Sequence, residues 1–122
     1  MNATLHDDWK QDARQLLEQL EAHWHPRIHP RELHQRLKHL LLAVKHELSH
    51  DTGDARMVAS TYRRLLEHQA SRSELQQANQ ALERIFADLG LTLASILPLA
   101  FVTVPSLFSL ARHFGIDLLP EL

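Results

Sequence analysis

Two histidines and a glutamate near the middle of the chain have the spacing of a catalytic zinc motif. The segment His46-Glu47-Leu48-Ser49-His50 matches the pattern H-E-x-x-H. On a helix the two histidines would lie one turn apart on one face, where they could share a zinc ion while Glu47 polarises a bound water. This spacing makes a zinc metallopeptidase one candidate function.

A catalytic zinc site needs a third protein ligand, and the sequence does not supply it at the usual place. In the extended pattern H-E-x-x-H-x-x-G-x-x-H, Gly53 fits, but Arg56 stands where the last histidine belongs, and a cation cannot bind zinc. Glu67 or Glu74 could serve as a distant third ligand. Zincins also hold their substrate along an edge strand, and we find no strand pattern in the sequence. We therefore expect no enzyme and no cofactor, with the histidine pair as a weak metal candidate at the surface.

Length, charge and composition narrow the class of protein. A chain of 122 residues predicts a single domain, residues 1–122. Its 13 basic and 15 acidic residues give a net charge of -2, which argues against DNA binding. The absence of cysteine excludes disulfides and thiol nucleophiles. Ten histidines make the chain His-rich, and protonation of all of them would move the net charge to +8.

Hydrophobic side chains recur with the period of an amphipathic helix in two long segments. These faces predict helices over residues 5–24 and 31–50, packed antiparallel. Pro26 and Pro30 break the chain between them. Residues 1–30 are therefore expected to form an N-terminal helix and a proline-rich turn.

Turn and capping signals divide the next part of the chain. Residues 51–54 are turn and capping types, and they precede a shorter helix that we expect to end near Ala70. Ser71 and Glu74 then fit a capping box, in which each side chain satisfies a backbone N–H of the other at a helix start. The helix that follows is expected to end at a cap on Gly90.

Residues 89–111 contain no charged side chain. One helix of that length could cross about 30 Å of hydrocarbon, but Pro98 and Pro105 would kink it twice. We expect a Pro-broken apolar C-terminal hairpin, buried centrally under the other helices, and the alternative is a segment inserted in or lying on a membrane. The predicted fold class is an all-α bundle of five to six helices.

Residues 45–122 carry an ordered series of motifs: S-R-S-E-L-x-x-A-N-x-x-L, then I-L-P-L, then T-V-P, and finally F-G-I-D-L-L-P. Pro98, Pro105, Gly115 and Pro120 set the spacing P-x(6)-P-x(9)-G-x(4)-P. This series resembles the domain that follows the membrane segment in the LETM family, whose founders are leucine-zipper and EF-hand-containing transmembrane proteins of the mitochondrial inner membrane. Because the chain has no EF-hand loop and no heptad tail, it resembles a short, bacterial-type form.

The resemblance implies a non-enzymatic all-α interaction module that associates with the ribosome, or that lies at a membrane and takes part in cation homeostasis. A ribosome, a membrane protein or a membrane surface is the implied partner, and no clear secretory signal begins the chain. We therefore expect a cytoplasmic or peripheral inner-membrane protein that is not secreted. The resemblance also implies six characteristic positions of the family, and we expect most of their residues to have structural roles. These residues are Glu47, Pro98, Pro105, Gly115, Asp117 and Pro120.

Four arginines are candidate contacts for such a partner. Arg56, Arg63, Arg64 and Arg72 fall on one predicted helix and the turn after it. Their guanidinium groups could bind phosphate. The alternative interpretation is a solvated helix face.

Overall fold

The computed structural model describes residues 9–25, 27–89 and 102–119, and in them the secondary structure consists of helices, without a strand. The described helices are α2 (Trp9–Trp24), α3 (Pro30–Leu48), α4 (Gly53–Leu66), α5 (Arg72–Leu89) and α7 (Val104–His113). The predicted all-α class is confirmed. The first limb of the predicted hairpin, with Pro98 and the cap on Gly90, lies outside the described residues, so the hairpin and a sixth helix stay predictions.

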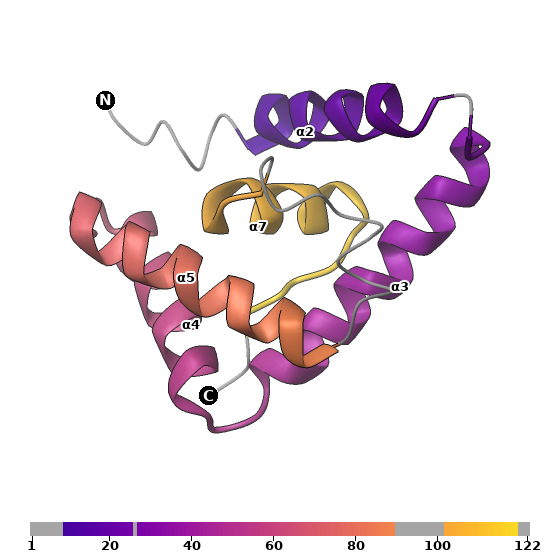
Figure 1. Ribbon diagram of the computed structural model, residues 1–122. Helices are drawn as coiled ribbons and strands as arrows, with labels where there is room; N and C mark the ends of the chain where they lie inside the picture. Colours follow the sequence, from indigo (N-terminus) through magenta and orange to yellow (C-terminus); the bar gives the residue numbers. More distant parts are fainter. Residues whose placement is uncertain (1–8, 26, 90–101, 120–122) are drawn as a thin grey trace.

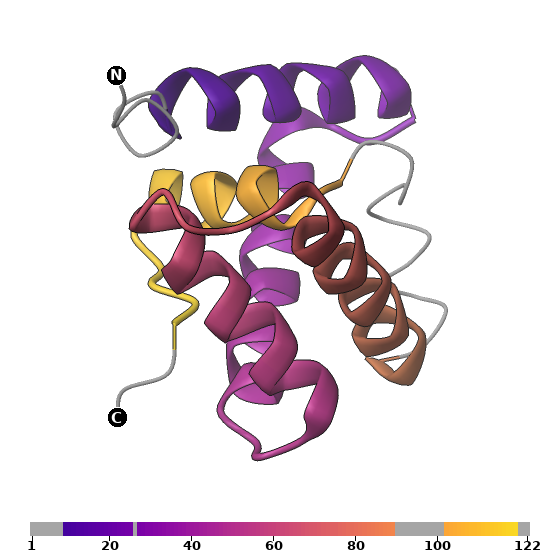
Figure 2. The same ribbon diagram turned by 90° about the vertical axis from the view of Figure 1, so that its left-hand side faces the viewer.

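The last helix, α7, occupies the middle of the structure. In Figures 1 and 2 it lies beneath α2, with α4 and α5 on its other side. It packs most extensively against α2. Its own side chains before Arg112 are mostly apolar and lie on several faces of the helix. Such a helix is stable in water only when other helices pack on several of its sides. Its buried residues are Val104, Leu107, Phe108, Ser109, Leu110 and Ala111.

The part of the charge-free segment that forms α7 is buried, while the hairpin itself stays a prediction. The described part of the charge-free segment begins again at Val102, which packs against the hydrophobic core. Across the described ranges, no helix combines the length and the apolar character needed to cross a membrane.

Two long amphipathic helices border the core: α2 packs on α7, and α3 packs on α4 and α5. Each buries one stripe of leucines, among them Leu20 of α2 and Leu37 of α3, which are fully buried. Pro30, one of the two predicted breaks, is the first residue of α3. A proline fits this position because the N–H that it lacks would have no partner within the helix there. The helix ends at Leu48, two residues before the predicted end.

Helices α4 and α5 run antiparallel and are joined by ion pairs at both ends. Near the start of α4, Asp54 accepts hydrogen bonds from the Arg84 guanidinium of α5, at 2.9 Å from Nη2 to Oδ1. Near the other end, Arg64 Nε lies 2.8 Å from Glu74 Oε2. The predicted capping box is confirmed, because Ser71 and Glu74 exchange side-chain to backbone bonds of 3.0 and 3.1 Å.

The prediction that this shorter helix ends near Ala70 is wrong, because α4 ends at Leu66. His68 adopts the left-handed conformation with φ 60°. Its N–H donates to the Leu65 carbonyl at 3.0 Å, and the Gln69 N–H donates to the Arg64 carbonyl at 2.7 Å. This pair of bonds is a Schellman motif, which closes a helix by satisfying its last carbonyls.

The start of α7 is fixed by side chains from two elements. Asn79 of α5 accepts a 2.8 Å hydrogen bond from the Val104 N–H. Thr103 caps the helix and forms a capping box with Ser106. Pro105 lies in the first turn of α7, where a proline begins a helix without loss of a hydrogen bond.

The end of α7 explains two of the family-pattern residues in structural terms. Gly115 has φ 74° and donates to the Arg112 carbonyl at 2.9 Å, while the Ile116 N–H donates to the Ala111 carbonyl at 2.8 Å. Glycine adopts this conformation without steric cost. Asp117 then caps a tight turn, because its Oδ1 accepts a 3.1 Å bond from the Leu119 N–H. Pro120 lies outside the described residues.

Two adjacent leucines of α3 provide a matched test of the packing. Leu41 is fully buried, whereas Leu42 is 45% exposed. We expect Leu41→Ala to lower the free energy of unfolding by about 2–5 kcal/mol, because it removes buried methyl groups and leaves a cavity. Leu42→Ala should change it by no more than about 0.5 kcal/mol. Urea denaturation followed by circular dichroism measures both, and equal losses in the two variants would contradict the orientation of α3.

Candidate functional site

The two histidines of the zinc-like motif lie close together at the end of α3. Their ring centroids are 4.7 Å apart. Only His46 belongs to the helix, because α3 ends at Leu48 and His50 follows its C-cap, Ser49. Glu47 Oε2 lies 3.8 Å from His50 Nδ1. The structure thus keeps the two imidazoles adjacent, although His50 is not on the helix as predicted.

The third ligand required for zinc catalysis is not assembled around this pair. Among residues 9–25, 27–89 and 102–119, no group of three histidine, cysteine, aspartate or glutamate side chains is placed to hold a metal ion. Glu74, a candidate for that role, binds Arg64 and the backbone N–H of Ser71 at the start of α5. Glu67, the other candidate, is the exposed C-cap of α4.

The turn between α3 and α4 borders a groove of about 680 Å³, which we call the arginine groove. Arg56 and Arg63 line it from α4, two helical turns apart on one face. His50 and Ser60 add polar atoms, and Asp51 adds a carboxylate. The remaining lining residues are Leu48, Ser49, Gly53, Ala55, Met57 and Ala59.

The Arg56–Asp51 ion pair of the arginine groove is accessible to solvent. Arg56 Nε lies 3.2 Å from Asp51 Oδ1, and their side chains are 70% and 85% exposed. Ion pairs at that exposure contribute only about 0–1 kcal/mol and exchange readily with other anions. Arg56 can therefore bind an incoming anion at little cost.

The other two predicted contact residues lie elsewhere. Arg64 binds Glu74 and also donates to the Gln69 carbonyl at 3.2 Å, so it fixes the turn between α4 and α5. Arg72 is the exposed first residue of α5. The structure brings Arg56 and Arg63 together in one groove and does not bring Arg64 and Arg72 into it.

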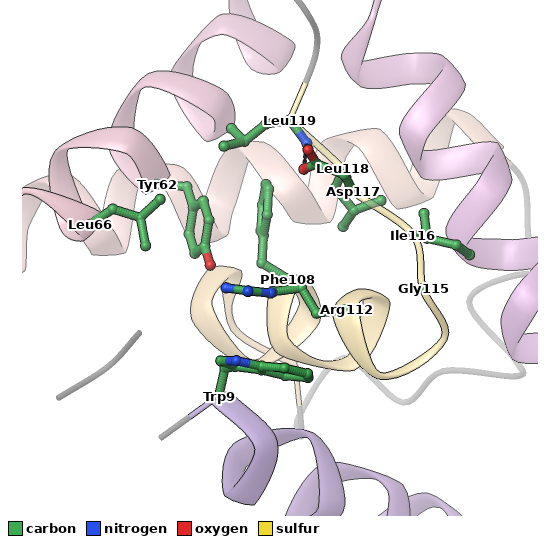
Figure 3. Close-up of a pocket in the computed structure, with 10 residues that line it drawn as sticks. All are labelled: Trp9, Tyr62, Leu66, Phe108, Arg112, Gly115, Ile116, Asp117, Leu118 and Leu119. Atoms are coloured by element: carbon green, nitrogen blue, oxygen red, sulfur yellow. Dashed lines mark hydrogen bonds between the residues drawn. The ribbon is translucent and has the colours of Figure 1, made fainter. Parts of the chain in front are cut away.

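A second groove, of about 510 Å³, contains residues that the sequence analysis did not select; we call it the aromatic groove. Figure 3 shows three helices contributing to it, with Trp9 from α2, Tyr62 from α4, and Phe108 and Arg112 from α7. The segment after α7 forms the remaining wall. The other lining residues are Leu66, Gly115, Ile116, Asp117, Leu118 and Leu119.

Ring contacts hold the polar groups of the aromatic groove in place. The Arg112 guanidinium carbon lies 4.6 Å from the centroid of the Trp9 ring. The Tyr62 ring stacks on Phe108 with centroids 3.9 Å apart and planes inclined by 15°. In Figure 3 the Arg112 guanidinium lies between the Trp9 indole and the Tyr62 hydroxyl, to which it hydrogen-bonds. The cation is therefore pre-oriented by its neighbours.

Burial raises the pKa of the Tyr62 hydroxyl above its usual value, because the charged phenolate would lose hydration. The Arg112 charge opposes this rise, and the Asp117 carboxylate adds to it. The hydroxyl is therefore neutral at physiological pH and available as a hydrogen-bond donor.

No local signal in the sequence marks the aromatic groove. Trp9 and Arg112 are far apart in the chain, and their contact depends on the packing of α2 against α7. Tyr62 and Phe108 also lie on the apolar faces of their helices, and that spacing predicts only buried core residues. These side chains come together only through the tertiary packing of α2, α4 and α7.

Comparisons with protein-family models, with curated proteins and with solved structures gave no match for this chain. Membership of the LETM family stays a prediction that rests on the sequence motifs.

The arrangement around His50 predicts how the protein responds to a metal chelator. We expect EDTA to leave the circular dichroism spectrum and the melting temperature unchanged, because the end of α3 is closed by backbone bonds and Ser49. His50→Ala should change the free energy of unfolding by less than about 0.5 kcal/mol, since its side chain is 48% exposed. One zinc per chain that survives desalting and is lost in His50→Ala would instead support the metallopeptidase.

Because Tyr62 is the single tyrosine of the chain, its ionisation can be followed by absorbance at 295 nm. We expect a midpoint above pH 10 in the folded protein. The unfolded chain in guanidinium chloride should titrate near pH 10, at about the reference value.

The sign of the stability effect follows from this difference. A folded-state pKa above the unfolded value means that this group's contribution to stability is fully present below pH 10 and is lost as the pH rises through the folded pKa. Tyr62→Phe should abolish the titration. Identical midpoints in the folded and unfolded protein would contradict the burial of this hydroxyl.

Proposed function

We propose that this chain is a non-enzymatic, LETM-like interaction module that binds the ribosome through phosphate groups of ribosomal RNA. The observation that carries the proposal is that Arg56 and Arg63 line the same groove. The resemblance of residues 45–122 to the LETM family gives a ribosome as the partner to test first.

Guanidinium groups suit this role because each offers a planar set of N–H donors that matches a phosphate. Arg56 and Arg63 are two turns apart, a separation of about 10 Å along the helix axis. Successive phosphates of a folded RNA backbone lie within reach of such a pair. His50 and Ser60 add hydrogen-bonding groups to the same groove.

The overall charge of -2 fits a small number of local phosphate contacts better than a long electrostatic track. The Asp51 carboxylate partly neutralises the groove when no partner is bound, since it pairs with Arg56. Such an exposed pair is weak, so a phosphate can replace the carboxylate. Binding through this groove is expected to be moderate in strength and strongly dependent on salt.

The zinc metallopeptidase is the alternative proposal. The observation that favours it is the 4.7 Å separation of the His46 and His50 rings. A third ligand would have to come from residues outside those described or from a rearrangement. The metal measurement given above tests this alternative independently of ribosome binding.

Co-sedimentation with ribosomes tests the leading proposal. We expect the wild-type chain to pellet with ribosomes at low salt and to be released between about 50 and 200 mM salt. Arg56→Gln/Arg63→Gln should weaken pelleting and lower the slope of log affinity against log salt by about two, one for each lost phosphate contact. The matched control is Arg36→Gln/Lys38→Gln, which removes the same charge from exposed positions of α3.

Three results would overturn the proposal. One is the absence of pelleting at low salt, and another is an equal effect of the groove and control variants. The third is flotation of the chain with vesicles of phosphatidylglycerol and phosphatidylcholine while ribosomes do not bind it. That last result would favour the membrane-associated role in cation homeostasis.

A further inference from the structure

The aromatic groove has features that ribosome binding through the arginine groove does not use. Its volume of about 510 Å³ lies within the range of small-molecule sites, which are mostly apolar with a few convergent polar groups. Its walls combine the Trp9, Tyr62 and Phe108 rings with aliphatic side chains. Arg112 and the Tyr62 hydroxyl supply polar atoms at one side, as Figure 3 shows.

We propose that the aromatic groove binds a small organic acid, with an apolar body among the rings and a carboxylate on the Arg112 guanidinium. Arg112 is an exposed side chain of the last turn of α7, and it reaches the groove over the face of Trp9. A guanidinium held flat on an indole is pre-organised for the planar, two-point contact that a carboxylate makes.

The Tyr62 hydroxyl fits the same assignment. It lies beside Arg112 at the groove, and its ring is fixed by stacking on Phe108. As a neutral phenol it can turn its proton toward an anion, whereas a phenolate would repel it. A carboxylate bound here would therefore receive donors from two side chains that come from different helices.

Asp117 is the single carboxylate among the residues that line the groove, and its own turn holds it in place. Its carboxylate accepts the Leu119 N–H at 3.1 Å, which holds it in the turn after α7. In Figure 3 this carboxylate lies toward Leu119, on the side of Phe108 away from Trp9. Asp117 thus already has a partner in its own turn, whereas the Arg112 guanidinium lies beside the Trp9 and Tyr62 rings.

Three probes that share a phenylbutyl body separate charge from apolar burial: 4-phenylbutyrate, 4-phenylbutyramide and 4-phenylbutylamine. They are titrated into the full chain, and binding is followed in ¹H–¹⁵N correlation spectra for the backbone amides and in ¹H–¹³C correlation spectra for the Tyr62 ring. We expect 4-phenylbutyrate to bind about tenfold more tightly than the amide, the size of effect given by one charge-assisted hydrogen bond. The amine should bind more weakly than the amide, because Arg112 repels it.

Variants then test the residue that carries the selectivity. Arg112→Gln should remove the preference for the acid over the amide, while Arg36→Gln, an exposed arginine of α3, should preserve it. The melting temperature of each variant shows whether it is folded. If Arg112→Gln does not fold, the wild-type shift map decides, because binding in the groove must perturb the Tyr62 ring protons and the amides of Gly115 and Leu119.

The proposal is overturned if the three probes bind equally or if the amine binds best. It is also overturned if millimolar 4-phenylbutyrate leaves the Tyr62 ring signals unchanged. These measurements do not depend on ribosome binding, so either proposal can fail while the other stands.

Discussion

The burial of α7 is the constraint on which the remaining structure depends. A helix that is apolar on nearly every side needs cover from several directions, and α2, α4 and α5 provide it. Its first N–H groups also need partners, because an unpaired buried donor is costly. Asn79 supplies one of them from α5, and Thr103 supplies another from the cap. The packing of α7 then places Phe108 and Arg112 beside residues of two other helices, and so creates the aromatic groove.

Much of the helical layout could be predicted from local sequence. The period of buried leucines located α2 and α3, and Ser71 with Glu74 located the start of α5, because a capping box is a short-range pattern. The end of α4 could not be predicted in the same way. It depends on His68 in a left-handed conformation, which glycine or asparagine would have signalled and histidine does not. The place of Pro105 in the first turn of α7 could not be predicted either, because a proline in an apolar run can kink a helix or begin one.

The candidate sites show a similar division between local and tertiary information. Arg56 and Arg63 were predicted as contacts together with Arg64 and Arg72, and it is the packing of α3 and α4 that places only the first two in one groove. The proximity of His46 and His50 also followed from spacing, but a third ligand depends on which other chain segments reach them. Trp9, Tyr62 and Arg112 come from three helices, and no periodicity within one segment could relate them.

The pairing of α2 with α7 also affects how the chain acquires its structure. These helices are each other's main neighbour, yet α3, α4 and α5 lie between them in sequence. In a nascent chain the leucine stripe of α2 therefore lacks its main cover until α7 has emerged, whereas α4 and α5 can pair earlier. Loss of α7 from the chain would leave the same stripe without its main cover, and such exposed hydrophobic surface promotes aggregation.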